Sequence, residues 1–407
     1  MRGRLGRQFA GVFVSRGLGS ALQAVALVIL ARSVSPAVFG AVSAVIAVVG
    51  FVLVVTGGGM SIFVPWARAR AEHDAVAAAL RFNSWSNVLS ALVLVPAIAW
   101  WATSSATPLA VALVGLSLAL ERNVDTWLGV PIADGESKVA VVSVLVRRVG
   151  CLLVMIPVIL AGGDPVLALG AGLVTGALAA QWHVRRAVRG LEGDASVLGV
   201  RAILGRAAPF LVANVTGQAR TLDVGVVSLV GGPLAAGVYA AANKLVQPAL
   251  LVPQALSTVL VPHSTRLDPS SARRLGARLA AGLVACAVLA VPLVVWREQV
   301  VVLILGEQYR GAGLTFAVAL AGVGFVAWAA TVAAVLQGQG RQKLVARLGV
   351  LFAILSLGGV AGGAASWGPT GAAAGLTVSW AAYAVVLAVL LASPSRGTGP
   401  QDDGPAG

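Results

Sequence analysis

Charged residues are scarce in this sequence. Only 11% of its 407 residues are Asp, Glu, Lys or Arg, whereas 58% are hydrophobic. Soluble globular domains ordinarily contain about 25% charged residues, so this composition excludes a soluble domain of this length. A helix needs about 20 apolar residues to cross a bilayer, which leaves room here for about a dozen spans and little else.

Cysteine and histidine are scarcer still. Cys151 and Cys286 lie inside apolar runs, where a thiol behaves as a small hydrophobic group, and they exclude a disulfide framework. His73, His183 and His263 are scattered along the chain and belong to no HExxH or similar metal-binding motif. The sequence therefore predicts no metal, no other cofactor and no enzymatic activity.

The apolar runs, broken by Gly, Pro and charged residues, predict an all-α integral membrane protein. We expect an N-terminal lobe at residues 1–190, a cytoplasmic linker at 191–207, a C-terminal lobe at 208–392 and a disordered tail at 393–407. Each lobe has six predicted spans, at 9–31, 38–60, 80–103, 108–130, 139–161 and 166–188, and at 208–230, 236–261, 277–296, 312–336, 345–365 and 370–392.

The two lobes show internal similarity at an offset of about 200 residues, the size of a half-molecule. Six is an even number of crossings, so the second lobe begins on the same side as the first, and the repeats are parallel. The expected site is then the cleft between the lobes. The matching segments are Pro36–Gly40 with Pro233–Gly237, Gly135–Lys138 with Gly340–Lys343, and Pro165–Gly172 with Pro369–Gly375.

Basic residues outnumber acidic ones, 29 to 15, and most of them lie in the connections between predicted spans. On one side of the membrane these connections carry only Arg32, Arg297 and Arg310, while the other side collects the rest. The positive-inside rule then places both termini in the cytoplasm of a multi-pass protein of the cell (cytoplasmic) membrane. The same distribution argues against nucleic acid as a partner.

Polar residues inside the spans are costly in lipid and indicate a buried or water-filled position. Arg16, Ser20 and Gln23 form one stripe of the first span; Arg16 either reaches the nearby head groups or faces a cavity. In the eighth span, Asn243, Lys244 and Gln247 lie close together, and the amides either line the substrate path or bond to neighbouring helices.

The seventh span is polar on two opposite faces and should therefore be buried between the lobes. Arg220 is near its middle, where it either faces the cavity or pairs with Asp223 three residues later. The two faces consist of Asn214, Gln218 and Thr221, and of Thr216, Arg220 and Asp223.

Two acidic residues, Glu121 and Asp125, share a face of the fourth span one turn apart. Arg147 and Arg148 lie at a similar depth in the fifth span. An interhelical ion-pair cluster is the simpler interpretation, and a role in ion coupling or substrate contact is the alternative.

Three segments resemble the polysaccharide biosynthesis proteins, the Wzx-type oligosaccharide flippases of the MOP flippase superfamily. They lie at residues 30–61, 237–262 and 303–322, in the order and spacing typical of that family. The resemblance implies a two-lobed transporter with alternating access and a cationic central cavity that receives a lipid-linked pyrophosphate.

In such a cavity Arg16, Arg220 and Lys244 would bind the pyrophosphate, because charged donors pair strongly with phosphate oxygens in a low-dielectric cleft. The resemblance implies a polyprenyl-pyrophosphate-linked oligosaccharide for a surface polysaccharide as substrate. Membrane lipids and glycan-assembly proteins are the other expected partners.

Two alternatives remain open at this stage. A cation-coupled multidrug exporter of the same superfamily would use Asp223, Glu121 or Asp125 as its coupling acid, but the first span offers Arg16 and no acid. A polysaccharide polymerase or ligase would need a sizeable outer loop, and the longest outer connection, around 297–310, is short.

Overall fold

A computed structural model describes residues 2–101, 108–188, 193–264, 288, 290–339 and 341–393. Its described residues form helices and no strand, which confirms the predicted all-α fold. The helices are α1 (Arg2–Ser33), α2 (Pro36–Thr56), α3 (Met60–Ala69), α4 (His73–Trp101), α5 (Pro108–Trp127), α6 (Gly129–Ala133), α7 (Ser137–Leu160), α8 (Pro165–Ala187), α9 (Val200–Gln218), η2 (Ala219–Leu222), α10 (Asp223–Ser264), α12 (Arg297–Leu305), η3 (Glu307–Tyr309), α13 (Gly313–Gly338) and α14 (Gln342–Ala392).

Seven segments of the described chain are long and apolar enough to cross a membrane, judged by length and composition. Two of them, Val200–Leu250 and Gln342–Ala392, contain more than one helix. The backbone leaves helical geometry at Gly232 in the first and at Trp367 and Gly368 in the second. The predicted span at 277–296 lies mostly outside the described residues.

Proline and a polar cap set the start of two helices as the sequence pattern suggests. Ser35 precedes Pro36 at the start of α2, and its hydroxyl accepts a bond from the amide of Val38 at 3.4 Å. Asp164 precedes Pro165 at the start of α8, and its carboxylate accepts bonds from two backbone amides at 2.8 Å. Such caps satisfy amides that have no partner within the helix.

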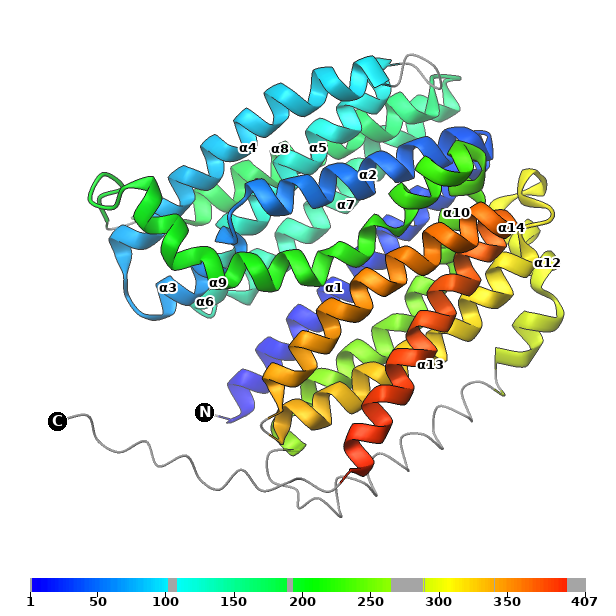
Figure 1. The fold of residues 1–407 in the computed structure, drawn as a ribbon. Helices are drawn as coiled ribbons and strands as arrows, with labels where there is room; N and C mark the ends of the chain where they lie inside the picture. Colours follow the sequence, from blue (N-terminus) through cyan, green and yellow to red (C-terminus); the bar gives the residue numbers. More distant parts are fainter. Residues whose placement is uncertain are drawn as a thin grey trace.

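The helices form two halves that meet at one end and diverge toward the other (Figure 1). In the N-terminal half, α1, α2, α4, α5, α7 and α8 pack on one another, and in the C-terminal half α10, α13 and α14 do the same. Helix α9 packs on α2, α3 and α4, and it leads through η2 into α10 of the other half.

The halves touch most closely where α2 meets α10. A Cβ atom on Gly40 would overlap the carbonyl oxygen of Pro233, and one on Gly237 would overlap that of Pro36. These residues belong to the two repeat-related segments, so equivalent turns of the two halves pack directly against each other. Small residues allow such close approach of backbones between membrane helices.

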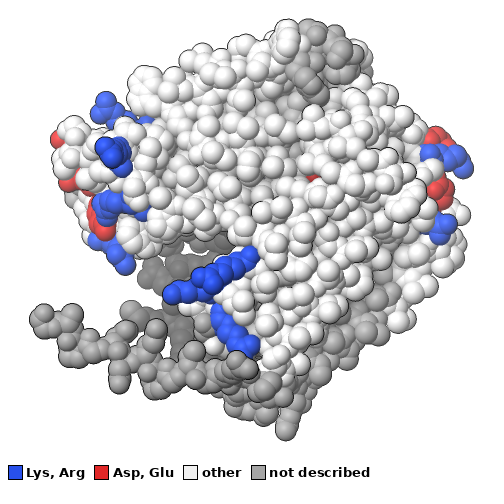
Figure 2. Space-filling view, in the orientation of Figure 1, with Lys and Arg blue, Asp and Glu red and all other residues white. Residues whose placement is uncertain are grey.

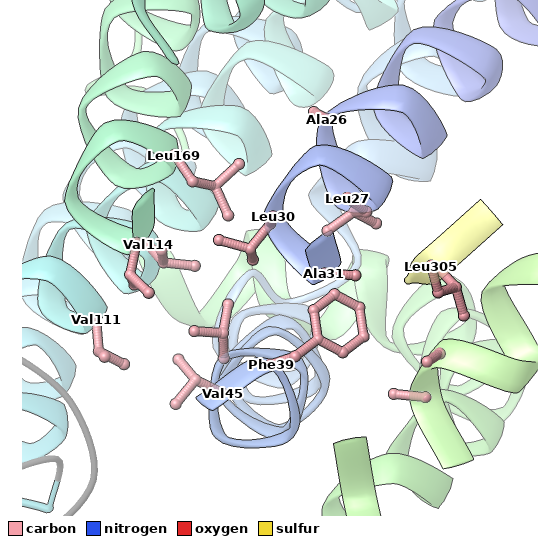
Figure 3. Close-up of a cluster of buried hydrophobic side chains, with 14 of the residues drawn as sticks. Ala26, Leu27, Leu30, Ala31, Phe39, Val45, Val111, Val114, Leu169 and Leu305 are labelled. Atoms are coloured by element: carbon pink, nitrogen blue, oxygen red, sulfur yellow. The ribbon is translucent and has the colours of Figure 1, made fainter. Parts of the chain in front are cut away.

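An apolar core seals this same end of the molecule. Leu27, Leu30 and Ala31 of α1 lie among side chains of α2, α5 and α8, with Leu305 of α12 nearby (Figure 3). The cluster continues into Tyr309, whose ring meets that of Phe39 edge-on at 6.2 Å between centroids. We call this the closed end.

Two side chains at the closed end cap helices of the opposite half. The Arg32 guanidinium, at the end of α1, donates to the carbonyl oxygens of Leu303 and Ile304 at the end of α12. In return, the amide of Gln308 donates to the carbonyl oxygens of Ala31 and Arg32, at 2.8 and 3.2 Å. Each helix therefore has C-terminal carbonyls satisfied by the other half.

The predicted continuous span at 208–230 is wrong in detail. Helix α9 begins earlier, at Val200, and the chain forms the short 3₁₀ helix η2 at 219–222. Thr216 and Thr221 bond to backbone carbonyls of Val212 and Gln218, at 2.8 and 2.7 Å. Such local bonds compete with regular helical pairing and favour a break.

Helices α3 and α6 were not predicted either, because both are short. Gly58 and Gly59, with positive φ values of 59° and 78°, turn the chain from α2 into α3. Arg68 of α3 then pairs with Asp134, next to α6, at 2.9 Å. The two helices pack together beside the end of α5.

We expect Gly237→Ala to weaken the contact between the halves. The new methyl group would overlap the Pro36 carbonyl, and overpacking of this kind costs about 1–3 kcal/mol. Thermal unfolding of the purified protein in detergent, together with spin-label distances between α4 and α13 at the closed end, measures the effect.

Gly358→Ala in α14 is the matched control, since nothing lies within 4 Å of its added Cβ. That variant should be as stable as the parent or more stable by up to about 1 kcal/mol, from helix propensity. Equal stability of the two variants would show that α2 and α10 do not approach each other so closely.

Candidate functional site

A cavity of about 620 Å³ lies between the two halves. Helices α1, α2 and α5 line it from the N-terminal half, and the end of α9, η2 and α10 line it from the other side. Its polar lining consists of Gln23, Ser43, Glu121, Arg122, Asp125, Gln218, Arg220, Thr221, Asp223, Asn243, Lys244 and Gln247.

The structure brings most of the predicted site residues to this one cavity. The sequence predicts a substrate-binding set of Arg16, Gln23, Asn214, Gln218, Arg220, Asn243, Lys244 and Gln247, and an ionic set of Glu121, Asp125, Arg147, Arg148 and Asp223. The cavity is lined by Gln23, Gln218, Arg220, Asn243, Lys244 and Gln247 of the first set and by Glu121, Asp125 and Asp223 of the second. Asn214 is elsewhere: its amide donates to the Ser61 hydroxyl at 3.3 Å and joins α9 to α3. The side chain of Arg16 lies outside the described residues.

Arg220 is positioned by the break at η2. Its guanidinium carbon lies 4.4 Å from the ring centroid of Trp380 in α14, a cation–π contact. The side chain thus lines the cavity while it rests on an aromatic surface of the C-terminal half.

Asp223 bonds to partners other than Arg220. Its carboxylate accepts a bond from the Tyr239 hydroxyl at 2.9 Å and one from the amide of Val224 at 2.7 Å. Tyr239 is fully buried, so the carboxylate is held against the wall of α10. The described residues show no ion pair within 4 Å between Arg220 and Asp223.

The two acids of α5 form ion pairs with arginines of α7 that lie outside the cavity lining. Arg147 of α7 bonds to Asp125 at 2.8 Å, and Arg148 bonds to Glu121 at 2.8 Å. Neither arginine lines the central cavity. Asp125 is the most open of the four, with 47% of its side chain exposed, against 7% for Arg147.

Arg122 is a cavity residue that was not among the predicted site residues. It lines the cavity together with Leu118, Glu121 and Asp125, at the i, i+3, i+4, i+7 spacing of one helix face. Its guanidinium also donates to the Ser61 hydroxyl at 3.4 Å. The spacing was visible in the sequence, but only the two acids were assigned to this face.

The charges of the cavity do not cancel. The wall itself carries Arg122, Arg220 and Lys244 against Glu121, Asp125 and Asp223. Two of those acids are neutralised by arginines of α7. The residues that line the cavity and the two arginines of α7 behind them comprise five basic and three acidic groups. The described site therefore has a surplus of positive charge, which fits an anionic ligand.

A buried polar network also holds α5 in place. Asn123 donates to Gln181 of α8 and accepts from Asn83 of α4, both at 2.9 Å, and Thr126 donates to Asn83 at 3.1 Å. All four side chains are buried. Although the Gln181 amide nitrogen has no hydrogen-bond partner, these interhelical bonds connect α4, α5 and α8 and so help to position the helix that carries Arg122.

The described residues contain no group of three or more His, Cys, Asp or Glu side chains that could hold a metal ion. The cavity instead offers guanidinium, ammonium, amide and hydroxyl groups. These can bind and neutralise phosphate oxygens and can bond to sugar hydroxyls.

A family model described as "Polysaccharide biosynthesis protein" matches residues 5–268. The match confirms the resemblance drawn from the sequence, and two of the three segments used for it lie within the matched range. Among curated proteins, none shows detectable sequence similarity to this chain.

Solved structures of the MOP superfamily share the fold. An inward-facing multidrug resistance MATE family transporter is similar with a TM-score of 0.73 and 14% identity over 92% of this chain and 94% of that one. An outward-facing conformation gives 0.62, also at 14% identity, over 95% and 94%. A transporter from Pyrococcus furiosus, described as having a binding pocket of reverse polarity, gives 0.63 at 14% identity over 95% and 94%.

We expect Tyr239→Phe to destabilise the protein, because Asp223 then loses a hydrogen-bond donor in a buried setting. Hydrogen bonds to charged groups contribute about 1.5–3 kcal/mol. Tyr309→Phe is the matched control, since the Tyr309 hydroxyl is buried and makes no hydrogen bond. Thermal unfolding in detergent should show a lower transition for the first variant alone; equal transitions would exclude a stabilising bond at Asp223.

Proposed function

We propose that this chain, which belongs to the polysaccharide biosynthesis protein family, moves a polyprenyl-pyrophosphate-linked oligosaccharide across the cytoplasmic membrane by alternating access. The substrate would serve the assembly of a surface polysaccharide. The proposed activity is transport, with no covalent change to the substrate.

The positive surplus of the central cavity carries this proposal. A pyrophosphate bears at least two negative charges, and the three basic groups of the wall, Arg122, Arg220 and Lys244, line the same cavity. Arginine offers paired donors that match phosphate oxygens and keeps its charge at all physiological pH values. The acids of α5 are already neutralised, so they do not oppose an anion.

The remainder of the lining suits a glycan. Gln23, Asn243 and Gln247 present amides on the walls contributed by α1 and α10. Amides donate and accept at once, which is what sugar hydroxyls require. The polyprenyl chain is apolar and would remain in the bilayer beside the cleft.

The distribution of charge supports a multi-pass orientation in the cytoplasmic membrane. On the face seen in Figure 2, charged side chains gather at the two ends, and the surface between is nearly free of them. One end, the basic end, carries Arg68, Arg70, Arg185, Arg186 and Arg206. By the positive-inside rule this end would face the cytoplasm, together with both termini.

This orientation would make the structure a cytoplasm-facing state. The halves are joined at the closed end and diverge toward the basic end (Figure 1). The greater similarity to an inward-facing than to an outward-facing relative supports the same assignment. Transport would then require the α2–α10 contact to open while the basic end closes, as alternating access demands.

A cation-coupled multidrug exporter is the second candidate. Solved relatives of this fold are described as multidrug transporters, and Asp223 places an acid on the cavity wall. Against it, the first helix has no acidic residue, and Lys244 and Arg220 would repel a cationic drug. The Pyrococcus furiosus relative is described as having a binding pocket of reverse polarity that suggests a different function, so pocket polarity is not the same in all proteins of this fold.

We expect Arg220→Glu to abolish translocation, because it converts a donor of the cavity into a charge that repels pyrophosphate. The assay is transfer of a fluorescent polyprenyl-pyrophosphate-linked oligosaccharide between leaflets of proteoliposomes. A loss of at least about tenfold in rate is expected, since about 1.4 kcal/mol of lost binding already gives that factor.

Arg297→Glu makes the same change at an exposed position at the start of α12, outside the cavity lining, and should transport normally. Unchanged transport by Arg220→Glu would refute the proposed substrate site. Efflux of a cationic dye that is lost in Asp223→Asn would favour the exporter instead.

A further inference from the structure

Helix α7 places two arginines where they can change the polarity of the cavity without lining it. Arg147 and Arg148 are adjacent in sequence, and each bonds to an acid of α5 that faces the cavity. The two acids, Asp125 and Glu121, are one turn apart on α5. Two consecutive arginines of α7 therefore form ion pairs with two acids of α5 that are four residues apart.

Tight packing behind the wall fixes this arrangement. Arg147 is buried, and its backbone lies against Gly176 of α8, where a Cβ atom would overlap the Arg147 carbonyl. Arg148 and Glu121 line a small pocket between α1, α2, α5, α7 and α8. Both guanidiniums therefore meet the acids from outside the lining of the central cavity.

Without the two arginines, the described wall would carry equal numbers of acidic and basic groups. With them, two of its three acids are neutralised, and Arg122, Arg220 and Lys244 outnumber the remaining acid, Asp223. Opposite charges within hydrogen-bond distance cancel most of each other's field at longer range, whereas an unpaired charge in a site with little water acts strongly on a ligand.

We infer that Arg147 and Arg148 are specificity-determining positioning residues, which keep the cavity selective for anionic head groups by neutralising Asp125 and Glu121 from behind the wall. The inference rests on the proposed function. It assigns the choice between an anionic and a cationic ligand to residues that touch neither.

A double-mutant cycle on the Arg147–Asp125 pair tests this role. The variants are Arg147→Gln, Asp125→Asn and the two combined, each purified in nanodiscs. The readouts are the dissociation constants for a polyprenyl diphosphate, for the uncharged polyprenol, and for a monocationic dye. Arg310→Gln is the matched control, since it removes an arginine from an exposed pair with Glu307 on the segment after α12.

We expect Arg147→Gln to weaken diphosphate binding by about tenfold, because an uncompensated carboxylate then faces the cavity. Dye binding should strengthen in the same variant. The combined variant should restore both values to within about threefold of the parent, because removing both charges leaves the sum unchanged. Polyprenol binding and the Arg310→Gln control should not change.

Three results would overturn the inference. If the combined variant binds diphosphate as weakly as Arg147→Gln, the arginine contacts the ligand directly or acts only through packing. If Arg147→Gln binds diphosphate like the parent, the pair does not set the cavity charge. If Arg147→Gln binds the cationic dye no more tightly than the parent does, the loss of the arginine has not changed the charge of the cavity.

Failure of the proposed function has a separate signature. In that case the parent protein would bind polyprenyl diphosphate no better than polyprenol, whatever the variants do. If Arg147→Gln does not fold, the same cycle on Arg148→Gln and Glu121→Gln decides the matter. A combined variant that folds but does not recover diphosphate binding again overturns the inference.

Discussion

The cost of charge inside a membrane is the constraint on which the rest of this structure depends. An ionised side chain without a partner or water is strongly unfavourable there. Asp125 and Glu121 are bonded to arginines of α7, and Arg220 rests on Trp380. These contacts link α5 to α7 through side chains and η2 to α14. The same ion pairs and cation–π contact that lower the cost of charge in the membrane also determine the polarity of the cavity.

Much of the architecture could be predicted from the sequence, because apolar runs and the proline and polar residues that bound them are local signals. The two halves were also visible as a repeat that relates Pro36–Gly40 to Pro233–Gly237. The sequence did not show that these segments touch. Contact between Gly40 and Gly237 depends on how the surfaces of the two halves meet, which no single stretch of sequence records.

Other features were missed for identifiable physical reasons. The break at 219–222 arises from side-chain bonds to the backbone, which compete with helical pairing where an apolar pattern suggests continuity. Arg122 follows Glu121 directly, and its place in the cavity emerges only when the whole face of α5 is traced. The network around Asn123 joins three helices, and its members are so far apart in sequence that their hydrogen bonds could not be predicted from a local pattern.

The reciprocal caps formed by Arg32 and Gln308 bear on how easily the halves can part. Each side chain serves backbone carbonyls that would otherwise end a helix unsatisfied. Exposed charged residues such as Arg310 place this end near water, so carbonyls released on separation would be hydrated at once. Exchange of a hydrogen bond with water has a net cost of only about 0.5–1.5 kcal/mol. These two caps thus fix how the ends of α1 and α12 align, while adding little to the free energy that holds the halves together.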